Sequence, residues 1–558
     1  MLHTDCKKKE DRKIAYFTME IGLSNNIPTY SGGLGILAGD TIKTFADLKV
    51  PVICMTLLNR QGYFKQHIND NCMQEELAVE WDPQTDLTKL ETTVQIQIEK
   101  RTVTIGVWEY LVKGESAGTL PVYFLDTDLP ENTDYDRALC GHLYAGDRKY
   151  RFCQEMILGI GGARMIEALQ YTGIEKFHLN EGHAALATVE LLNNTNDDIE
   201  HVKEHCVFTT HTPVAAGHDT FDIKLAGQLI GDFYPWETKL AEHDGKFNMT
   251  YLALNLSNYI NGVAKKHQEV SMHMFPGREI HSITNGIHTQ TWTGKELAAV
   301  FDEHIPDWRH DPFSLRAALS IPQKQIWDAH QKAKGRLLDR INKEHNAEFE
   351  EDVLTIGFAR RATAYKRADL VFTDINWLKA IAQRAGKIQF VFAGKAHVQD
   401  TQGKELIQKI CHLRLELGDK IKLVWLENYE MELGKLITNG VDIWLNTPMR
   451  PLEASGTSGM KAAVNGVPNF SVLDGWWIEG HIEDRTGWSI GPLPKGLDYD
   501  DSTVDAKDLY DKLEHKILPM YYKRKEDWIH VMKHSIALNG SFFHTHRMAQ
   551  QYVTNAYF

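Results

Sequence analysis

The sequence predicts an α/β fold made of two doubly wound domains. Three observations lead to this prediction. The chain has 558 residues, which is too long for a single ordinary core. Short apolar runs alternate with helical patterns along both halves of the chain. Polar residues directly follow several of these runs, as expected where parallel strands end at a ligand-binding edge.

The predicted strands are runs rich in β-branched and aromatic residues. In the first half they are Lys13–Thr18, Val50–Leu58, Leu120–Leu125 and His205–Thr210. In the second half they are Val353–Phe358, Ile388–Ala393, Ile421–Leu426, Val441–Leu445 and Val467–Val472. Several are almost continuously apolar, which favours parallel sheets that helices cover on both faces.

The domain boundary is predicted where the strand pattern pauses. Between residues 290 and 350 the chain is charged and helical, for example over Pro322–His345, before strands resume. We therefore expect an N-terminal domain over residues 1–290 and a second domain over residues 291–540. The aromatic and polar segment 541–558 is predicted to be a helix that packs back on the first domain.

Composition narrows the class of protein. A net charge of −14, from 61 basic and 75 acidic residues, argues against a broad nucleic-acid surface. The seven cysteines are scattered and form no C-x-x-C pair, which is typical of reduced thiols in a cytoplasmic protein. No run approaches the roughly 18 apolar residues of a membrane span, and the start of the chain lacks the apolar stretch of a signal peptide. We expect a soluble cytoplasmic protein without nucleic-acid or membrane partners.

A glycine-rich motif over residues 30–40 could bind an anion. Its sequence is Tyr-Ser-Gly-Gly-Leu-Gly-Ile-Leu-Ala-Gly-Asp, and a helical pattern follows through Leu48. Glycines allow backbone N–H groups to approach a ligand, and a helix N-terminus adds partial positive charge. The spacing matches neither common nucleotide-binding loop, so a tight strand-to-helix turn explains the motif equally well.

Two further motifs carry charged groups that suit phosphate or an aldehyde. Residues 360–367 place four cations after a predicted buried strand, where Arg side chains could hold phosphoryl groups in bidentate fashion. In residues 450–461, Glu453 could accept hydrogen bonds from sugar hydroxyls. Lys461 lies about two turns into the helix, where a buried lysine can form an imine. A lone lysine on such a helix is more often a surface residue. The 26 histidines form no complete set of metal ligands, and we assign no metal.

Together these motifs resemble the glycogen, starch and maltodextrin phosphorylase family, in particular its short bacterial and archaeal α-glucan phosphorylase branch. The similar stretches run from Ala15–Met19 through Glu453–Lys461 to Asp474–Trp477 and cover most of the chain in order. The resemblance implies two Rossmann-like domains that face each other across a cleft, the GT-B architecture. It also implies an α-1,4-glucan phosphorylase, which uses inorganic phosphate to release terminal glucose as α-D-glucose 1-phosphate with retention.

The resemblance also assigns roles to individual residues. Lys461 would hold pyridoxal 5′-phosphate as a Schiff base, and the cofactor's phosphate rather than its imine would assist proton transfer. Further cofactor contacts would come from Tyr429, Arg360 and Thr457. The catalytic group would comprise Lys461, Arg361, Lys366 and His211, of which Arg361 and Lys366 match the basic pair that binds substrate phosphate. The glucosyl unit would be held by Gly33, Leu34, His211, Asn285, Glu453, Ala454, Ser455 and Gly456.

Two alternatives stay open at this point. A nucleotide-sugar-dependent glucan synthase shares the architecture and the basic residues at strand ends, but it needs no cofactor on Lys461. A non-catalytic glucan-binding protein of the same fold would be expected to lack catalytic positions, and the sequence keeps all of them. The sequence leaves open the preferred glucan and whether the chain forms a homo-oligomer.

Overall fold

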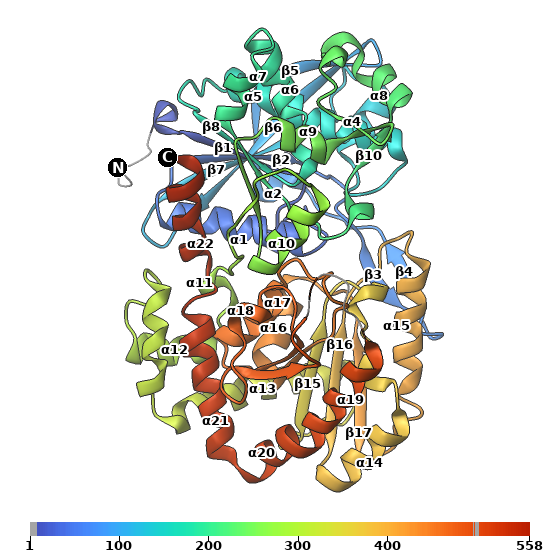
Figure 1. Ribbon diagram of the computed structural model, residues 1–558, viewed down its shortest axis with the longest axis vertical. Helices are drawn as coiled ribbons and strands as arrows, with labels where there is room; N and C mark the ends of the chain where they lie inside the picture. Colours follow the sequence, from blue (N-terminus) through green and yellow to red (C-terminus); the bar gives the residue numbers. More distant parts are fainter. Residues whose placement is uncertain (1–7, 495, 497–500) are drawn as a thin grey trace.

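The computed structural model describes residues 8–494, 496 and 501–558. Cys6 and the rest of the first seven residues, whose sequence argued against a signal peptide, lie outside the described residues. In Figure 1 two large β-sheets lie one above the other, and helices flank both of them. Mixed α/β structure with parallel sheet cores is therefore confirmed.

The upper sheet has nine strands. In spatial order they are β14 (His281–Ser282), β13 (Tyr259–Gly262), β9 (Cys206–Thr209), β8 (Lys176–Asn180), β1 (Ile14–Thr18), β2 (Val52–Leu57), β7 (Thr119–Asp126), β6 (Arg101–Lys113) and β5 (Thr88–Ile98). The strands from β14 to β7 are parallel. Strands β6 and β5 are antiparallel to their neighbours, so the expectation of purely parallel sheets is wrong at this edge.

A tight hairpin explains the antiparallel edge. Glu99 and Lys100 connect β5 to β6, and both have positive φ, at 53° and 65°. Positive φ at both central residues is the backbone geometry of the two-residue turn that suits twisted hairpin strands. The pair lacks the Asn-Gly or Asp-Gly signature of such turns, and this hairpin was not predicted.

The lower sheet has six strands, all parallel. Their order is β17 (Ile421–Leu426), β16 (Ile388–Ala393), β15 (Leu354–Ala359), β18 (Ile443–Asn446), β19 (Asn469–Val472) and β20 (Gly487–Ile490). All predicted strands of both halves are present, and their ends differ from the prediction by at most two residues. The central strands β15 and β16 are buried along their whole length, as their mostly apolar sequences predict.

Helices cover both faces of each sheet. In the first part of the chain they are α1 (Gly33–Asp47), α2 (Pro83–Asp86), α3 (Asp134–Arg137), α4 (Arg148–Met156), α5 (Gly162–Ala168), α6 (Ala187–Asn194), α7 (Ile199–His205), α8 (Ile223–Ile230), α9 (Met249–Asn255) and α10 (Lys265–Met274). The second part contains α11 (Thr289–Trp292), α12 (Lys295–His304), α13 (Gln323–His345), α14 (Ile375–Ala385), α15 (Thr401–Leu413), α16 (Met431–Gly440), α17 (Thr457–Val464), α18 (Trp477–Gly480), α19 (Ser502–Lys512), α20 (Leu518–Lys523), α21 (Lys525–His534) and α22 (Thr545–Tyr552).

The longest helix, α13, shows how the apolar pattern determines packing. Ile326, Ala333, Leu337 and Ile341 are buried, and their spacing of four or seven residues puts them on one face of a helix. Asn346 ends the helix in the left-handed conformation, with φ of 47°, which is a common way to stop a helix. The predicted helix over Pro322–His345 is therefore confirmed.

Two small sheets lie outside the main ones: the three-stranded β10-β12-β11 (Thr220–Asp222, Lys246–Asn248 and Glu242–His243) and the hairpin β3–β4 (Lys65–Ile68 and Gln74–Leu77). The hairpin reaches from the upper sheet to the lower one. The Gln66 side chain donates a hydrogen bond to the carbonyl of Gly394 (2.8 Å), and Gln74 donates one to the carbonyl of Ala396 (3.0 Å).

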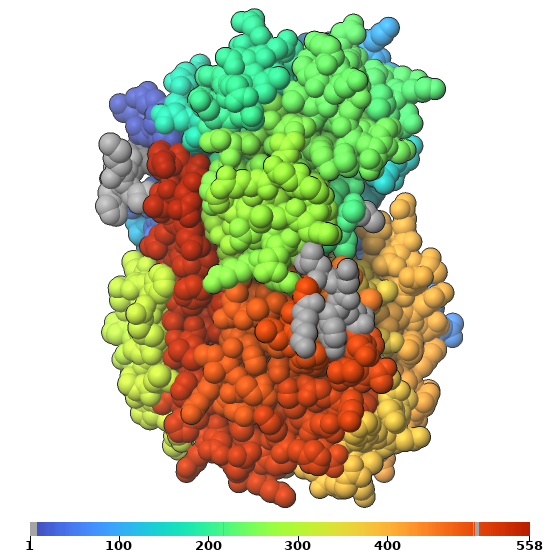
Figure 2. Space-filling model, viewed as in Figure 1, coloured from blue at the N-terminus to red at the C-terminus, as the bar shows by residue number. Residues whose placement is uncertain are grey.

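The end of the chain crosses between the two sheets. Helix α21 packs against α13 beside the lower sheet, and α22 packs on α1 beside the upper one. In Figure 2 this red segment runs along the molecular surface from the lower part to the upper part. The hydroxyl of Tyr557 hydrogen-bonds to Nδ1 of His178 in strand β8 (2.6 Å), so the last residues belong to the core of the upper sheet.

Candidate functional site

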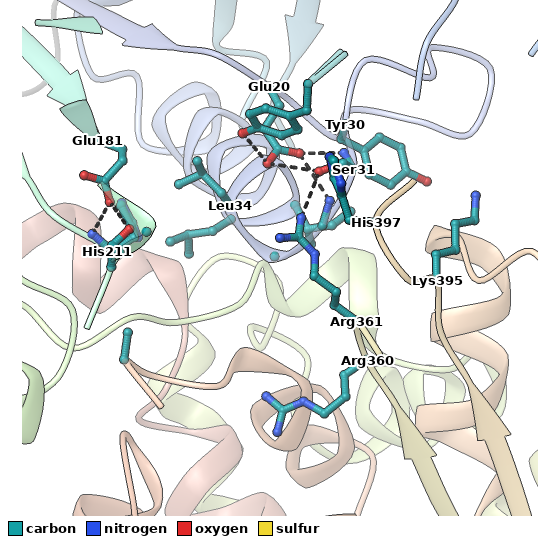
Figure 3. A pocket seen from close by; sticks show the side chains of 18 of the residues that line it. Glu20, Tyr30, Ser31, Leu34, Glu181, His211, Arg360, Arg361, Lys395 and His397 are labelled. Carbon is teal, nitrogen blue, oxygen red and sulfur yellow. Dashed lines mark hydrogen bonds between the residues drawn. The ribbon is translucent and has the colours of Figure 1, made fainter. Parts of the chain in front are cut away.

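A cavity of about 890 Å³ lies where the carboxyl ends of strands from both sheets meet. Every residue to which the resemblance assigns a role lines it: Gly33, Leu34, His211, Asn285, Arg360, Arg361, Lys366, Tyr429, Glu453, Ala454, Ser455, Gly456, Thr457 and Lys461. Figure 3 shows part of this lining, with the glycine loop above the two arginines. Their common location supports one site, whereas the role of each residue stays a prediction.

Glu20, which lies just beyond β1, holds the glycine loop in place. Its Oε2 atom accepts hydrogen bonds from the backbone N–H groups of Ser31 (2.6 Å) and Gly32 (3.2 Å), and its Oε1 atom accepts one from the Tyr144 hydroxyl (2.9 Å). Helix α1 begins at Gly33, so its first N–H groups lack partners within the helix. This helix N-terminus at the cavity wall favours a bound anion.

Two cations share one carboxylate at the lower wall of the cavity. Oε2 of Glu453 accepts hydrogen bonds from Nη2 of Arg360 (2.6 Å) and Nζ of Lys366 (2.7 Å). Burial alone would raise the pKa of Glu453, but the charges of Arg360 and Lys366 outweigh it and lower the pKa to about 2. The carboxylate is therefore ionised at neutral pH. Since it balances only one of two positive charges, the cluster retains a net positive charge for a ligand.

Arg361 joins the lower strand β15 to the glycine loop. Its Nη2 atom donates a hydrogen bond to the Ser31 hydroxyl at 3.3 Å. Figure 3 shows the guanidinium directed upward at this loop, apart from the neighbouring Arg360. Arg361 is an exposed residue that lines the cavity. A guanidinium with several donors available, opposite a helix N-terminus, suits a phosphate or another oxyanion.

His211 is held as a neutral imidazole at the upper wall. Its backbone N–H donates to Oε2 of Glu181 (2.8 Å), and its Nε2 atom lies 2.7 Å from Oδ1 of Asn180. Because Asn180 uses its own Nδ2 to donate to Thr18, its Oδ1 is oriented as an acceptor, which assigns the proton to Nε2 of His211. Burial lowers the pKa of His211 to about 4, so the ring is uncharged at neutral pH.

Several buried polar atoms of the lining have no partner within the described residues. They include Oδ1 of Asn285 and Oγ of Ser455, whose side chains are both less than a tenth exposed. Buried polar groups are nearly always hydrogen-bonded, so unpaired ones at a cavity wall indicate that a ligand or water completes them. The Asn285 backbone is fixed from behind, because Nη2 of Arg547 donates to its carbonyl (2.9 Å).

Lys461 lies in α17 with its amine against an aromatic ring. The side chain is buried, with 6% exposure, and Nζ lies 3.6 Å from the centroid of the Trp292 ring. Burial lowers the pKa of Lys461 to about 8, so a useful fraction of the amine is neutral near physiological pH. A buried amine with this pKa at a cavity wall is a competent nucleophile for a carbonyl group.

The remaining predicted residues lie around the start of α17. Gly456 precedes the helix in the left-handed region, with φ of 91°, and Thr457 is its first residue. A side chain at position 456 would be strained by this backbone conformation. Burial raises the pKa of Tyr429 to about 12, so its hydroxyl stays protonated and can donate a hydrogen bond into the cavity.

Comparison with known proteins identifies the family. A sequence model described as carbohydrate phosphorylase matches residues 234–490. A maltodextrin phosphorylase of Thermococcus litoralis is 39% identical over 98% of this chain and 71% of its own length. A glycogen phosphorylase of Aquifex aeolicus is 35% identical over 100% of this chain and 87% of its own, and one of Mycobacterium tuberculosis is 33% identical over 98% and 70%. The chain belongs to the carbohydrate phosphorylase family.

In this member of the phosphorylase family, the cavity also contains residues that were not predicted from the sequence. They include Glu20, Tyr144 and Trp292. Glu181 and Lys395 also line the cavity, and both lie directly beyond strands, where polar residues are expected to face the cleft. Nothing local distinguishes Tyr144 or Trp292 from the chain's many other aromatic residues.

No helix in the described part of the chain is long and apolar enough to cross a membrane. Within the same residues, no group of three or more His, Cys, Asp or Glu side chains could hold a metal ion. The six cysteines of the described part of the chain are all free and buried.

Proposed function

We propose that the protein is an α-1,4-glucan phosphorylase, which transfers the terminal glucose of a glucan to inorganic phosphate and releases α-D-glucose 1-phosphate. The single observation that carries the proposal is the shared cavity. It brings a buried amine, a basic cluster and a glycine-loop helix N-terminus to one place. Relatives named maltodextrin and glycogen phosphorylase, similar over nearly the whole chain, support the same activity.

The proposed architecture is the GT-B arrangement of two Rossmann-like domains that face each other across a cleft. The cavity supports it, because His211 comes from beyond upper strand β9 and Arg361 from beyond lower strand β15. We place the domains over residues 1–290 and 291–540, with residues 541–558 returning to the first one. The contact between α22 and α1 supports this division.

Inorganic phosphate would bind between Arg361, Lys366 and the N-terminus of α1. The Arg361 guanidinium approaches the loop before α1, and the two cations held by Glu453 lie on the same cavity. These groups would offset the repulsion between phosphate charges that otherwise opposes close packing of two phosphoryl groups. Glu453 would keep Lys366 oriented until the phosphate arrives.

The terminal glucosyl unit would lie against the upper wall. His211 and Asn285 offer polar side-chain atoms there, and the Oδ1 atom of Asn285 has no partner among the described residues. Ser455 and the backbone N–H groups around Gly456 would complete the hydrogen bonds to sugar hydroxyls. A neutral His211 suits this role, because its Nδ1 atom can accept a hydrogen bond from a sugar hydroxyl without adding charge near the glycosidic oxygen.

The residues at Lys461 fit pyridoxal 5′-phosphate. The amine is buried, lies at the cavity wall, and has no hydrogen-bond partner in the described structure, as expected of a group that attaches an aldehyde. Tyr429, Arg360 and Thr457 would contact the cofactor from the same wall. When bound, the cofactor would supply a phosphate group that gives and takes back a proton through the substrate phosphate.

The proposed reaction needs no carboxylate pair of the kind found in hydrolases. The substrate phosphate donates a proton to the glycosidic oxygen, the bond from that oxygen to C1 breaks, and a phosphate oxygen then bonds to C1 on the same face. Arg361 and Lys366 stabilise the phosphate charge throughout.

The test is glucose 1-phosphate formation by purified protein supplied with pyridoxal 5′-phosphate and maltodextrin, with and without inorganic phosphate. Product that depends on phosphate and disappears in Lys461→Ala would support the proposal. Undiminished turnover by Lys461→Ala would contradict the cofactor's attachment site. Absence of product, together with glucosyl transfer from a nucleotide sugar, would instead favour a glucan synthase.

A further inference from the structure

Asp40 carries a buried carboxylate that the proposed reaction does not use. It lies in α1 and is only 1% exposed. Its Oδ2 atom accepts a hydrogen bond from Nε1 of Trp292 at 2.8 Å, whereas Oδ1 is buried without any hydrogen-bond partner among the described residues. Burying a carboxylate with half of its hydrogen bonds unmade is costly unless positive charge lies nearby.

The amine of Lys461 supplies positive charge on the face of the same indole. Asp40 binds the edge of the Trp292 ring, and the amine of Lys461 lies 3.6 Å from the ring centroid. The three residues come from α1, α11 and α17, which are distant in sequence. Helices from both parts of the chain therefore meet at one carboxylate–indole–amine contact.

We propose that Asp40 is a positioning residue for Lys461: it fixes the Trp292 indole beneath the amine and supplies the negative charge that the amine faces inside the protein. This inference rests on the proposed function, in which Lys461 attaches the cofactor. The indole face orients the amine, because a cation is attracted to the centre of an aromatic ring. Asp40 keeps the indole from rotating, because its hydrogen bond fixes the direction of Nε1.

The charges around Lys461 make this proposal measurable. Burial lowers the pKa of Lys461, Asp40 raises it, and Lys43 lowers it further. Lys43 lies one turn beyond Asp40 in α1, and its amine lies 3.5 Å from the Thr291 hydroxyl. Two side chains of the same helix thus shift the pKa of Lys461 in opposite directions.

Asp40 and Lys43 are the charged groups that shift the pKa of Lys461. Burial lowers the pKa of Lys435 in α16, Arg336 and Lys43 lower it further, and Glu296 raises it. Burial lowers the pKa of Lys43, and the charges of Asp40 and Asp47 raise it. Changes at Asp40 and Lys43 are therefore the two that should move the titration of Lys461 most directly.

The experiment measures covalent attachment to Lys461 as a function of pH. The full-length protein is freed of bound aldehyde with hydroxylamine and mixed with pyridoxal 5′-phosphate between pH 6 and pH 10. The product is fixed with borohydride and quantified at Lys461 by peptide mass spectrometry. Because only the neutral amine attacks an aldehyde, the attachment rate rises through the pKa of Lys461.

We expect Asp40→Asn to move the midpoint of this profile to lower pH by about one unit, since an opposite charge is lost from a buried site. Asparagine can still accept the Trp292 hydrogen bond, so this variant removes the charge and keeps the contact. Lys43→Met should move the midpoint to higher pH. Asp47→Asn is the matched control, a buried carboxylate on the same helix whose side chain binds His288 and His546 instead, and it should leave the midpoint unchanged.

Trp292→Phe tests the platform separately. Phenylalanine keeps an aromatic face but cannot bind Asp40, so the ring is no longer held in one orientation beneath the amine and attachment should slow about threefold or more. A wild-type rate in this variant would overturn the platform, and an unmoved midpoint in Asp40→Asn would overturn the role of its charge. Loss of thermal stability without either change would leave Asp40 a purely structural residue, which also contradicts the proposal.

Failure of the proposed function would look different. If the wild-type protein attached no pyridoxal 5′-phosphate at Lys461, the cofactor assignment would fall. Competitive acetylation with acetic anhydride would then give the pKa of Lys461 without any cofactor, again by mass spectrometry. A lower pKa in Asp40→Asn would still support the contact, and an unchanged one would overturn it.

Discussion

Glu453 joins stability and ligand binding in one side chain. It neutralises a charge that would otherwise be buried beside a second one, because Arg360 and Lys366 bind the same oxygen atom. For buried ion pairs, the free energy of removing the charges from water is usually about as large as the attraction between them. Removal of one partner leaves the other charges buried without compensation. The cluster therefore keeps two cations in place for an anion, and their placement depends on the single carboxylate of Glu453.

We expect Glu453→Gln to lower the free energy of unfolding at neutral pH by about 3 kcal/mol, because the pKa of Glu453 is about 2 in the folded protein against an ordinary value of 4.5. A lowered folded pKa gives a stabilisation that is complete above pH 4.5 and is lost as pH falls toward 2. Urea unfolding at pH 7 and pH 3 checks this. A difference between variant and wild type that is the same at both pH values would contradict the electrostatic explanation.

Arg361 should affect the binding of phosphate more than the binding of glucan. Arg361→Ala removes a charge-assisted contact at the proposed phosphate site, so KM for phosphate should rise by about tenfold or more while KM for maltodextrin changes little. Arg361→Lys keeps the charge but not the planar pair of donors. Its KM for phosphate should therefore lie between those of the wild type and Arg361→Ala. Initial rates at varied phosphate measure the effect, and equal changes in both KM values would show that the residue acts on the whole cavity instead.

At the scale of single elements, helix α1 is the one whose position matters most for the site. It carries the glycine loop at its start and Asp40 in its middle, and it receives α22 on its flank. Gly39 lets it approach the chain beyond β1, because a Cβ there would lie 2.0 Å from the carbonyl oxygen of Gly22. The absence of a side chain at this position is therefore a packing requirement.

Gly39→Ala should destabilise the protein by about 2 kcal/mol or more, since the Gly22 backbone cannot move away without shifting the loop. Gly33→Ala is the matched control on the same helix, because a Cβ at Gly33 meets nothing within 4 Å. It should leave thermal stability within experimental error or raise it slightly, as alanine favours the helix. Thermal unfolding monitored by circular dichroism compares the two, and equal losses would exclude the clash as the cause.

The elements also show how far sequence reasoning reaches. Strands β16 and β17 were predicted to the residue, because a short run with a single polar residue is typical of a strand that helices cover on both faces. The β5–β6 hairpin was missed because β5 alternates exposed and partly buried residues, and its turn residues reveal their positive φ only in the structure. Local sequence patterns therefore predict which strands are buried, but they do not predict unusual backbone conformations.

The same limit applies to the site. His211 and Arg361 could be predicted because they follow strands, and strand ends converge in this class of fold. The partners that orient them could not, because Ser31 and Asn180 reach them from more than thirty residues away. The Trp292 platform likewise depends on three helices meeting, which no local pattern reports.

At the scale of the whole molecule, the returning chain end supports the site from behind. Nη1 of Arg547 donates to the carbonyl of Thr284 (2.6 Å), and Nη2 donates to that of Asn285. Arg547 is buried in α22, which lies outside the cavity. A residue near the end of the chain thus fixes a loop that belongs to the upper wall.

Arg547→Met should therefore raise KM for maltodextrin several-fold and leave KM for phosphate nearly unchanged, because the Asn285 loop loses two hydrogen bonds. Two buried carbonyls would lose their donor, at a cost to stability of about 2–4 kcal/mol. Steady-state kinetics and urea unfolding together check the prediction. Gln551→Ala, which removes only the side chain that Arg547 contacts on its own helix, is the control and should change neither KM.

The return of the chain end also has a consequence during protein synthesis. Met548, Tyr552, Val553 and Tyr557 are part of the apolar core beneath the upper sheet, together with residues of β1 and α1. Until residues 545–558 have been synthesised, that face of the upper sheet has no cover, although its strands left the ribosome hundreds of residues earlier. The nascent chain therefore exposes this apolar surface for as long as those residues are missing.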